Sequence, residues 1–185
     1  SREIKFLARL QHPNILPLHD SGHVLDMLYY VVPFIEGASL RERIDREKRL
    51  PVDEAVRISS ILAEALEYAH RKGVIHRDIK PENILLSGAH PILADFGVAR
   101  AIDAGVGRTL TQPGLGGPGT PAYMSPEQLL GDAELDARSD VYSLGCVLYE
   151  MLAGTPPFPG KDGFVRRFTE APPSLSRFRA DVPPQ

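Results

Sequence analysis

Two short stretches of this sequence carry the side chains needed for phosphoryl transfer. Residues 76–83 read His-Arg-Asp-Ile-Lys-Pro-Glu-Asn, and residues 95–97 read Asp-Phe-Gly. The first stretch places a carboxylate (Asp78), a cation (Lys80) and an amide (Asn83) on one short loop, and the second adds another carboxylate. Phosphoryl transfer requires a carboxylate that orients the attacking hydroxyl, oxygen ligands for magnesium, and positive charge near the moving phosphoryl group. These residue types meet all three requirements.

Two later stretches narrow the interpretation. Residues 119–127 read Gly-Thr-Pro-Ala-Tyr-Met-Ser-Pro-Glu, and residues 140–145 read Asp-Val-Tyr-Ser-Leu-Gly. A lone Asp-Phe-Gly would be weak evidence, but all four stretches in this order resemble the eukaryotic-type serine/threonine protein kinases. The run over residues 138–154 resembles the bacterial members of that family in particular. The resemblance implies ATP and Mg²⁺ as cofactors and protein serine or threonine residues as substrates.

The resemblance also implies a role for each polar residue. Asp78 would orient the substrate hydroxyl and accept its proton, while Lys80 would neutralise the transferring phosphate. Asn83 and Asp95 would bind magnesium. The Thr120 hydroxyl would bridge Asp78 and Lys80, an arrangement typical of serine/threonine rather than tyrosine kinases. The alternative for Thr120 is an ordinary turn residue.

Residues 31–37, Val-Val-Pro-Phe-Ile-Glu-Gly, resemble the kinase hinge that binds adenine. In this interpretation Val32 guards the back of the pocket, and the Pro33 carbonyl and the Ile35 N–H form the adenine hydrogen bonds. Leu85 would pack beneath the base. The alternative is that these residues are the plain apolar end of a strand.

The resemblance further implies that residues 1–185 form a partial kinase domain. Residues 1–35 would be the remnant of the small lobe and the hinge, and residues 36–185 an incomplete large lobe. Glu3 matches the glutamate that pairs with a strand lysine in this family, whereas the Gly-rich loop and that strand are not in this sequence. We therefore expect this segment alone to have low stability and almost no activity.

The segment after Asp-Phe-Gly contains two candidate phosphorylation sites, Thr109 and Thr111. Arg77 matches an arginine that binds an activation-loop phosphate in many family members, and a phosphothreonine there would order the loop. The alternative is two exposed threonines with no role. Residues 114–119 fit Gly-x-Gly-x-x-Gly, but no strand precedes them and Pro118 lacks an N–H, so we interpret them as a loop.

Several other polar residues are expected to be structural. By resemblance, His76 packs in an apolar column with Phe96, Leu7 and Leu18, although a catalytic His76 remains an alternative. Cys146 lies among apolar helix residues, so we expect it in the core.

Two carboxylates are assigned to the architecture by resemblance. Asp140 would hold the backbone of the catalytic loop. Glu127 would pair with an arginine beyond the end of this chain, and we therefore expect it here to be a buried carboxylate without a partner.

Hydrophobic periodicity and turn residues predict the elements that position these groups. Ser39 and Glu42 form a capping box, and Gly73 and Gly154 are natural helix ends. The long central helix is expected to bury Val56, Ile58, Ile61, Leu62, Ala65, Leu66 and Ala69. The expected elements are a helix over 4–10, strands at 15–18 and 28–35 joined by a turn through Gly22, a helix from Ser39 to about Arg49, a helix from Pro51 to about Gly73, strands at 74–75, 84–86 and 92–94, and a helix from about Ser139 to Ala153.

Bulk composition excludes several classes of function. The 185 residues are 43% hydrophobic and 24% charged, with a net charge of −3, which gives no reason to expect nucleic-acid binding. One cysteine excludes an intrachain disulfide and fits a reducing compartment. No stretch is apolar enough to span a membrane, so we expect a cytoplasmic segment without membrane contact, whose parent protein could be anchored elsewhere. Nothing in the sequence indicates the oligomeric state.

These observations predict an α+β, two-lobed protein-kinase-like fold, with part of the small lobe and a mostly helical large lobe. The predicted reaction is transfer of the ATP γ-phosphoryl group to serine or threonine of proteins, including the protein itself. Two alternatives stay open: a small-molecule phosphotransferase, and a kinase-like binding module without activity. A lysine in an upstream third strand would decide against the binding module.

Overall fold

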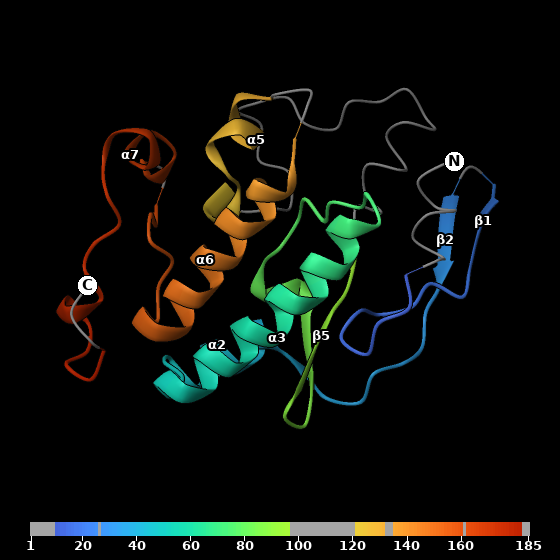
Figure 1. The fold of residues 1–185 in the computed structure, drawn as a ribbon, viewed down its shortest axis with the longest axis horizontal. Helices are drawn as coiled ribbons and strands as arrows, with labels where there is room; N and C mark the ends of the chain where they lie inside the picture. Colours follow the sequence, from blue (N-terminus) through green and yellow to red (C-terminus); the bar gives the residue numbers. More distant parts are fainter. Residues whose placement is uncertain (1–9, 26, 97–120, 132–134, 161, 183–185) are drawn as a thin grey trace.

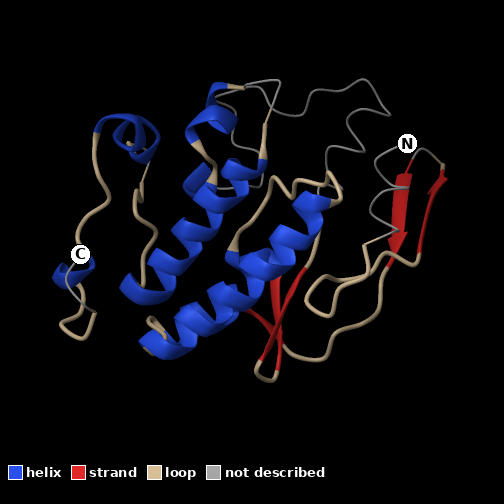
Figure 2. Cartoon of the chain, in the orientation of Figure 1, coloured by secondary structure: helices blue, strands red, loops and turns tan. Residues whose placement is uncertain are grey.

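Two helices that lie side by side form the centre of this computed structural model, which describes residues 10–25, 27–96, 121–131, 135–160 and 162–182. Figure 1 shows this pair, α3 (Val52–Arg71) and α6 (Ala137–Ala153). A two-stranded hairpin lies at one end of the molecule, and α7 (Gly163–Thr169) and the C-terminal segment lie at the other. Figure 2 shows that strands are confined to the hairpin and to one small sheet beside α3 in the part of the chain that the structure describes. This arrangement confirms the predicted α+β class.

The N-terminal hairpin consists of β1 (Asp20–Val24) and β2 (Met27–Val31), which pair antiparallel. The prediction of a strand at 15–18 and a turn at Gly22 is therefore wrong, because Gly22 lies inside β1 opposite Tyr29. A Cβ at Gly22 would lie 2.6 Å from the Tyr29 hydroxyl, so a larger residue there would require the exposed Tyr29 side chain to move. Ile15 forms only an isolated bridge, with Leu93.

Helix α2 (Leu40–Glu47) begins where the capping box predicted. The Ser39 side chain accepts a hydrogen bond from the Glu42 N–H, and the Glu42 carboxylate accepts one from the Ser39 N–H. The helix ends at Lys48, whose backbone is left-handed at φ 65°. The two reciprocal bonds satisfy backbone donors that the first helical turn leaves free.

Helix α3 is buried at five of the seven predicted positions, whereas Ile61 is half-buried and Val56 is largely exposed. Val56 is 49% exposed, because the buried stripe follows positions 55, 58, 62, 65 and 69 and Val56 lies one residue to its side. Leu62, by contrast, is fully buried in the core between α3 and its neighbours. The helix ends before Gly73, which adopts φ 75°.

Two strands of a three-stranded antiparallel sheet connect residues 76–83 to residues 94–96. Its order is β3 (Ala38–Ser39), β4 (Ile84–Ser87) and β5 (His90–Leu93). The predicted strand-turn-strand at 84–94 is confirmed, whereas residues 74–75 do not form the predicted strand. The Val74 N–H instead donates to the Ala69 carbonyl at 3.0 Å, so this residue completes the end of α3.

The C-terminal half is helical. Short helix α5 (Pro126–Leu130) precedes α6, and α6 begins two residues earlier than predicted because Asp136 caps it by accepting from the Arg138 N–H at 2.8 Å. Cys146 is buried in α6, and burial raises the pKa of its thiol to about 11, as expected for a core residue. Among the described residues, no helix combines the length and apolar character needed to cross a lipid bilayer.

Replacement of the buried Leu62 tests the position of the core. Leu62→Ala should lower the free energy of unfolding by about 2–5 kcal/mol, because it leaves a cavity between α3 and its neighbours. Val56→Ala, on the exposed side of the same helix, should change it by no more than about 0.5 kcal/mol. Urea unfolding of both variants measures the difference, and equal losses would contradict the helical phase described above.

Candidate active site

The catalytic-loop residues predicted from the sequence lie together. The Lys80 ammonium is 2.7 Å from Asp78 Oδ2, and Asn83 Nδ2 donates to the same oxygen at 2.9 Å. Asn83 Nδ2 also donates to the Asp78 backbone carbonyl at 2.8 Å. Asp78 remains about half exposed, while Asn83 is buried. The loop thus presents one oriented carboxylate to solvent, beside a cation and a fixed amide.

A carboxylate from α6 holds the backbone of this loop, as expected for Asp140. Its two oxygens accept from the His76 N–H and the Arg77 N–H, each at 2.8 Å. A third contact joins Asp140 Oδ2 to His70 Nε2 of α3 at 2.7 Å. Arg77 has φ 71°, a left-handed conformation that costs about 1–3 kcal/mol when a residue other than glycine adopts it. The two N–H bonds to Asp140 hold the chain in that conformation.

His76 is a buried connector rather than an exposed acid or base. Its Nε2 lies 2.9 Å from the Ala94 carbonyl, and its Nδ1 accepts from the Asp78 N–H at 3.2 Å. Burial lowers the pKa of His76, so the neutral ring with the proton on Nε2 satisfies both contacts. Its ring centroid is 4.4 Å from that of Phe96, as predicted for the apolar column. Leu18 of that column is partly buried against the core.

The segment that carries Asp95 is joined to the loop through Asn83. The Ala94 N–H donates to the Asn83 carbonyl at 2.9 Å, directly after β5. Asp95 is exposed with φ 60°, and Phe96 is buried. The β4–β5 hairpin therefore brings the Asp-Phe-Gly carboxylate to the same side of the molecule as the catalytic loop.

The predicted hinge runs between β2 and β3. Val32 is 44% exposed, and Pro33 and Ile35 are half-buried. Leu85 is half-buried in β4 and pairs with Ser39 in the register of the small sheet, just beyond the hinge segment. The binding of adenine by these four residues stays a prediction.

A small hollow beside Asp78 is lined partly by residues that the sequence did not indicate, among them Tyr123 and Gln128. The residues that line it are Arg77, Asp78, Ile79, Lys80, Tyr123, Met124, Gln128 and Ser143. Gln128 Nε2 donates to the Arg77 carbonyl at 2.7 Å, which ties α5 to the catalytic loop. The pair Ser125 and Gln128, which forms a second capping box, was the available sequence signal for this contact.

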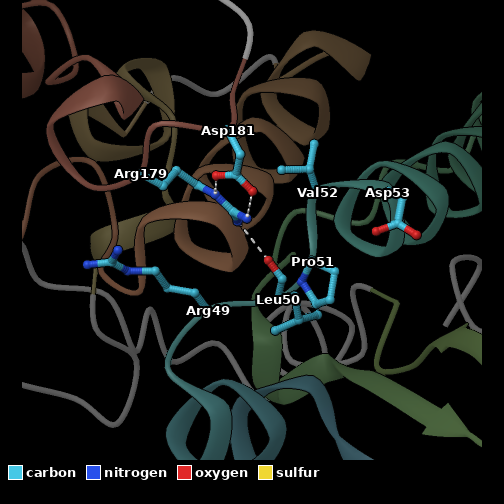
Figure 3. Close-up of a pocket in the computed structure, with 7 residues that line it drawn as sticks. All are labelled: Arg49, Leu50, Pro51, Val52, Asp53, Arg179 and Asp181. Carbon is cyan, nitrogen blue, oxygen red and sulfur yellow. Dashed lines mark hydrogen bonds and ion pairs between the residues drawn. The ribbon is translucent and has the colours of Figure 1, made fainter.

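A second, more open groove lies at the start of α3 (Figure 3). It is lined by Arg49, Leu50, Pro51, Val52, Asp53, Arg179 and Asp181. Arg179 donates to the Leu50 carbonyl at 2.7 Å and pairs with Asp181 at 2.6 Å, and Arg49 donates to the Phe178 carbonyl. These contacts attach the C-terminal segment to the body of the molecule, so we assign the groove a structural role.

Comparison with known proteins decides the family. The protein kinase domain family matches residues 1–176. The chain belongs to the protein kinase family. Serine/threonine-protein kinase PknB of Mycobacterium leprae is 43% identical over 164 residues, which cover 86% of this chain and 26% of that protein. PknB of Mycolicibacterium smegmatis is 40% identical over 192 residues, which cover 100% of this chain and 30% of that protein.

A solved structure shows the same fold. The crystal structure of the PknI kinase domain of Mycobacterium tuberculosis matches with a TM-score of 0.73 and 34% identity, over 98% of this chain and 64% of that one. The chain thus spans about a quarter to a third of the curated relatives it matches. Membership of the protein kinase family argues against the small-molecule phosphotransferase alternative.

Several predicted kinase residues lie outside the described parts of the structure. They are Glu3, Leu7, Thr109, Thr111, the glycines at 114–119, and Thr120. Their assignments, and the predicted helix over 4–10, stay predictions.

Glu127 differs from expectation. Its carboxylate is partly exposed rather than buried, and Oε1 accepts from the Ser139 hydroxyl at 2.5 Å. Burial acts to raise the pKa of Glu127, but the Ser139 hydroxyl and other hydrogen bonds outweigh it and lower the pKa. The expectation of a buried carboxylate without a partner is therefore wrong for this residue.

The buried His76 predicts a pH dependence of stability. Because burial lowers its pKa in the folded state, only the unfolded chain binds a proton there just below pH ~6.5, the ordinary histidine pKa. Its contribution to stability is complete above that pH and is lost as the pH falls, by at most about 1.4 kcal/mol per pH unit. Urea unfolding between pH 7 and 5.5 should show a shallower loss for His76→Gln than for the wild-type protein.

The matched control for this experiment is His90→Gln, which replaces an exposed histidine in β5. This variant should keep the wild-type pH slope. A wild-type slope in His76→Gln would contradict the assignment of His76 as a buried neutral ring.

Proposed function

We propose that the protein containing this chain transfers the γ-phosphoryl group of ATP to serine and threonine hydroxyls of proteins, with Mg²⁺. The observation that carries the proposal is the Asp78 carboxylate held between Lys80 and Asn83. Relatives at 40–43% identity bear the name serine/threonine-protein kinase, which supports the same acceptor here. The intact set of catalytic-loop contacts favours an enzyme over a kinase-like binding module.

Asp78 is arranged to accept a proton. Both hydrogen bonds from Lys80 and Asn83 go to Oδ2, and Oδ1 accepts none from the described residues. A substrate hydroxyl bound at Oδ1 would be oriented for attack and would pass its proton to this carboxylate. Lys80 lies close enough to offset negative charge on the transferred group, and it would be joined there by Thr120 in the predicted arrangement.

The residues present suit a magnesium ion. Asn83 uses its Nδ2 group on Asp78, so its Oδ1 is the atom that can bind a cation, and the exposed Asp95 follows the Ala94 N–H that bonds to Asn83. Mg²⁺ is usually held by one or two carboxylates together with phosphate oxygens and water. Bound there, the ion would neutralise the ATP phosphates. Val32, Pro33, Ile35 and Leu85 would hold the adenine.

We infer protein substrates and a cytoplasmic location for the catalytic segment, where ATP is available. The buried Cys146, the one cysteine of the sequence, is compatible with a reducing compartment.

Replacement of the proposed base tests the chemistry in the full-length protein. Asp78→Asn keeps the shape of the side chain but removes the proton acceptor, so turnover of ATP and protein substrate should fall about 10²–10⁴-fold. Asp53→Asn, the same change at an exposed position in α3, should retain wild-type turnover. Near-wild-type activity of Asp78→Asn in a radiolabel transfer assay would refute the assignment of Asp78.

The choice of acceptor is tested with matched peptides that differ only in the hydroxyl residue. Serine and threonine peptides should be labelled, and phosphate should appear on Thr109 or Thr111 of the protein itself. A phosphoamino-acid analysis dominated by phosphotyrosine would exclude the serine/threonine specificity.

A further inference from the structure

One guanidinium group, that of Arg41 in α2, joins segments far apart in the sequence. Its Nη2 lies 2.6 Å from the Tyr123 hydroxyl and 2.9 Å and 3.0 Å from the two Glu150 oxygens. Its Nε donates to Glu82 at 3.2 Å, and its Nη1 donates to Asp45 at 3.2 Å. Arg41 therefore contacts the catalytic-loop segment η1 (Pro81–Asn83), the turn η2 (Pro121–Tyr123) and α6 at once.

The charges in this cluster require one another. The Glu150 side chain is only 4% exposed, and a buried carboxylate is costly unless a cation and hydrogen bonds compensate it. Burial, followed by the charge of Glu150, raises the pKa of Tyr123 above its usual range. The phenol therefore stays protonated and donates to Glu150, while its oxygen accepts from Arg41.

The cluster holds one wall of the hollow beside Asp78. Tyr123 and Met124 line that hollow together with Lys80. The Tyr123 carbonyl accepts from the Ser143 hydroxyl of α6 at 2.7 Å, so the tyrosine is fixed at both its backbone and its phenol. The anchor at the phenol also involves the catalytic loop, because Arg41 bonds both the Tyr123 hydroxyl and Glu82.

We propose that Arg41 is a positioning residue for the acceptor polypeptide. It keeps η2, which faces the proton-accepting Asp78, at a fixed distance from the catalytic loop by bonding Tyr123 and Glu82 with one rigid group. This inference rests on the proposed function for its substrate, but its structural part concerns only the order of residues 121–128. Loss of Arg41 removes the link between η2 and Glu82 and weakens binding of the acceptor, while the ATP side of the site is unchanged.

Arg43 provides a matched control on the same helix. Its side chain is 23% exposed, against 22% for Arg41, and it pairs with two carboxylates where Arg41 pairs with three. Those partners, Glu47 and Glu54, belong to α2 and α3 and do not line the hollow beside Asp78. Replacement of Arg43 therefore removes a similar cation without disturbing η2.

The experiment compares Arg41→Met, Arg43→Met and the double variant Arg41→Met/Glu150→Gln in the full-length protein. The double variant removes the buried charge that Arg41→Met would leave unpaired, so it should recover the unfolding midpoint of the wild-type protein. Hydrogen exchange of the amides in residues 121–128 should be about tenfold faster in both variants that lack Arg41 and unchanged in Arg43→Met. In the same two variants, KM for a serine peptide should rise about 5- to 10-fold, with KM for ATP within about twofold.

The outcomes separate the two proposals. Equal exchange of residues 121–128 in Arg41→Met/Glu150→Gln and Arg43→Met would overturn the role of Arg41, whether or not phosphate is transferred. Full recovery of peptide KM in the double variant would also overturn it, because the effect of Arg41 would then be one of stability alone. A wild-type protein that labels no serine or threonine peptide would instead refute the proposed function.

Discussion

The buried carboxylate of Asp140 is the interaction on which the rest of the site depends. This side chain is 1% exposed and accepts hydrogen bonds from the backbone of His76 and Arg77 while contacting His70. Leaving such a charge without partners costs about 3–5 kcal/mol, so the loop has one strongly preferred conformation. The Asp140 bond to the Arg77 N–H also holds Arg77 in its left-handed conformation, directly before Asp78.

Buried groups support exposed ones throughout the site. Asp78 and Asp95, which would meet the substrates, lie at the surface, whereas His76 and Asn83, which orient them, are buried. A side chain that is packed and hydrogen-bonded loses little further entropy when a substrate binds, and this makes the geometry of the exposed carboxylate reproducible. The neutral ring of His76 links two segments, because one nitrogen contacts the Ala94 carbonyl and the other accepts from the Asp78 N–H.

Helix α6 acts as the common support of the site. Near its start Asp140 holds the catalytic loop, and near its end Glu150 holds Arg41 and Tyr123. Both carboxylates are buried and satisfied, so the one helix fixes the positions of two loops relative to each other. Similarity to a solved kinase domain over 98% of the chain agrees with this internal framework.

Local sequence signals predicted α2, α3, α6 and the β4–β5 hairpin, because caps such as Ser39 with Glu42 and the apolar stripe of α3 act within a few residues. They did not reveal α5, α7 or β3. Only the tertiary structure decided that Gly22 lies inside a strand opposite Tyr29 rather than in a turn, since that pairing depends on the neighbouring strand. It also decided the Arg41 cluster, in which Arg41 bonds to Tyr123, 82 positions further along the chain, and to Glu150, 109 positions further along. Such pairings leave no periodic trace in a single sequence, because they depend on how whole elements pack.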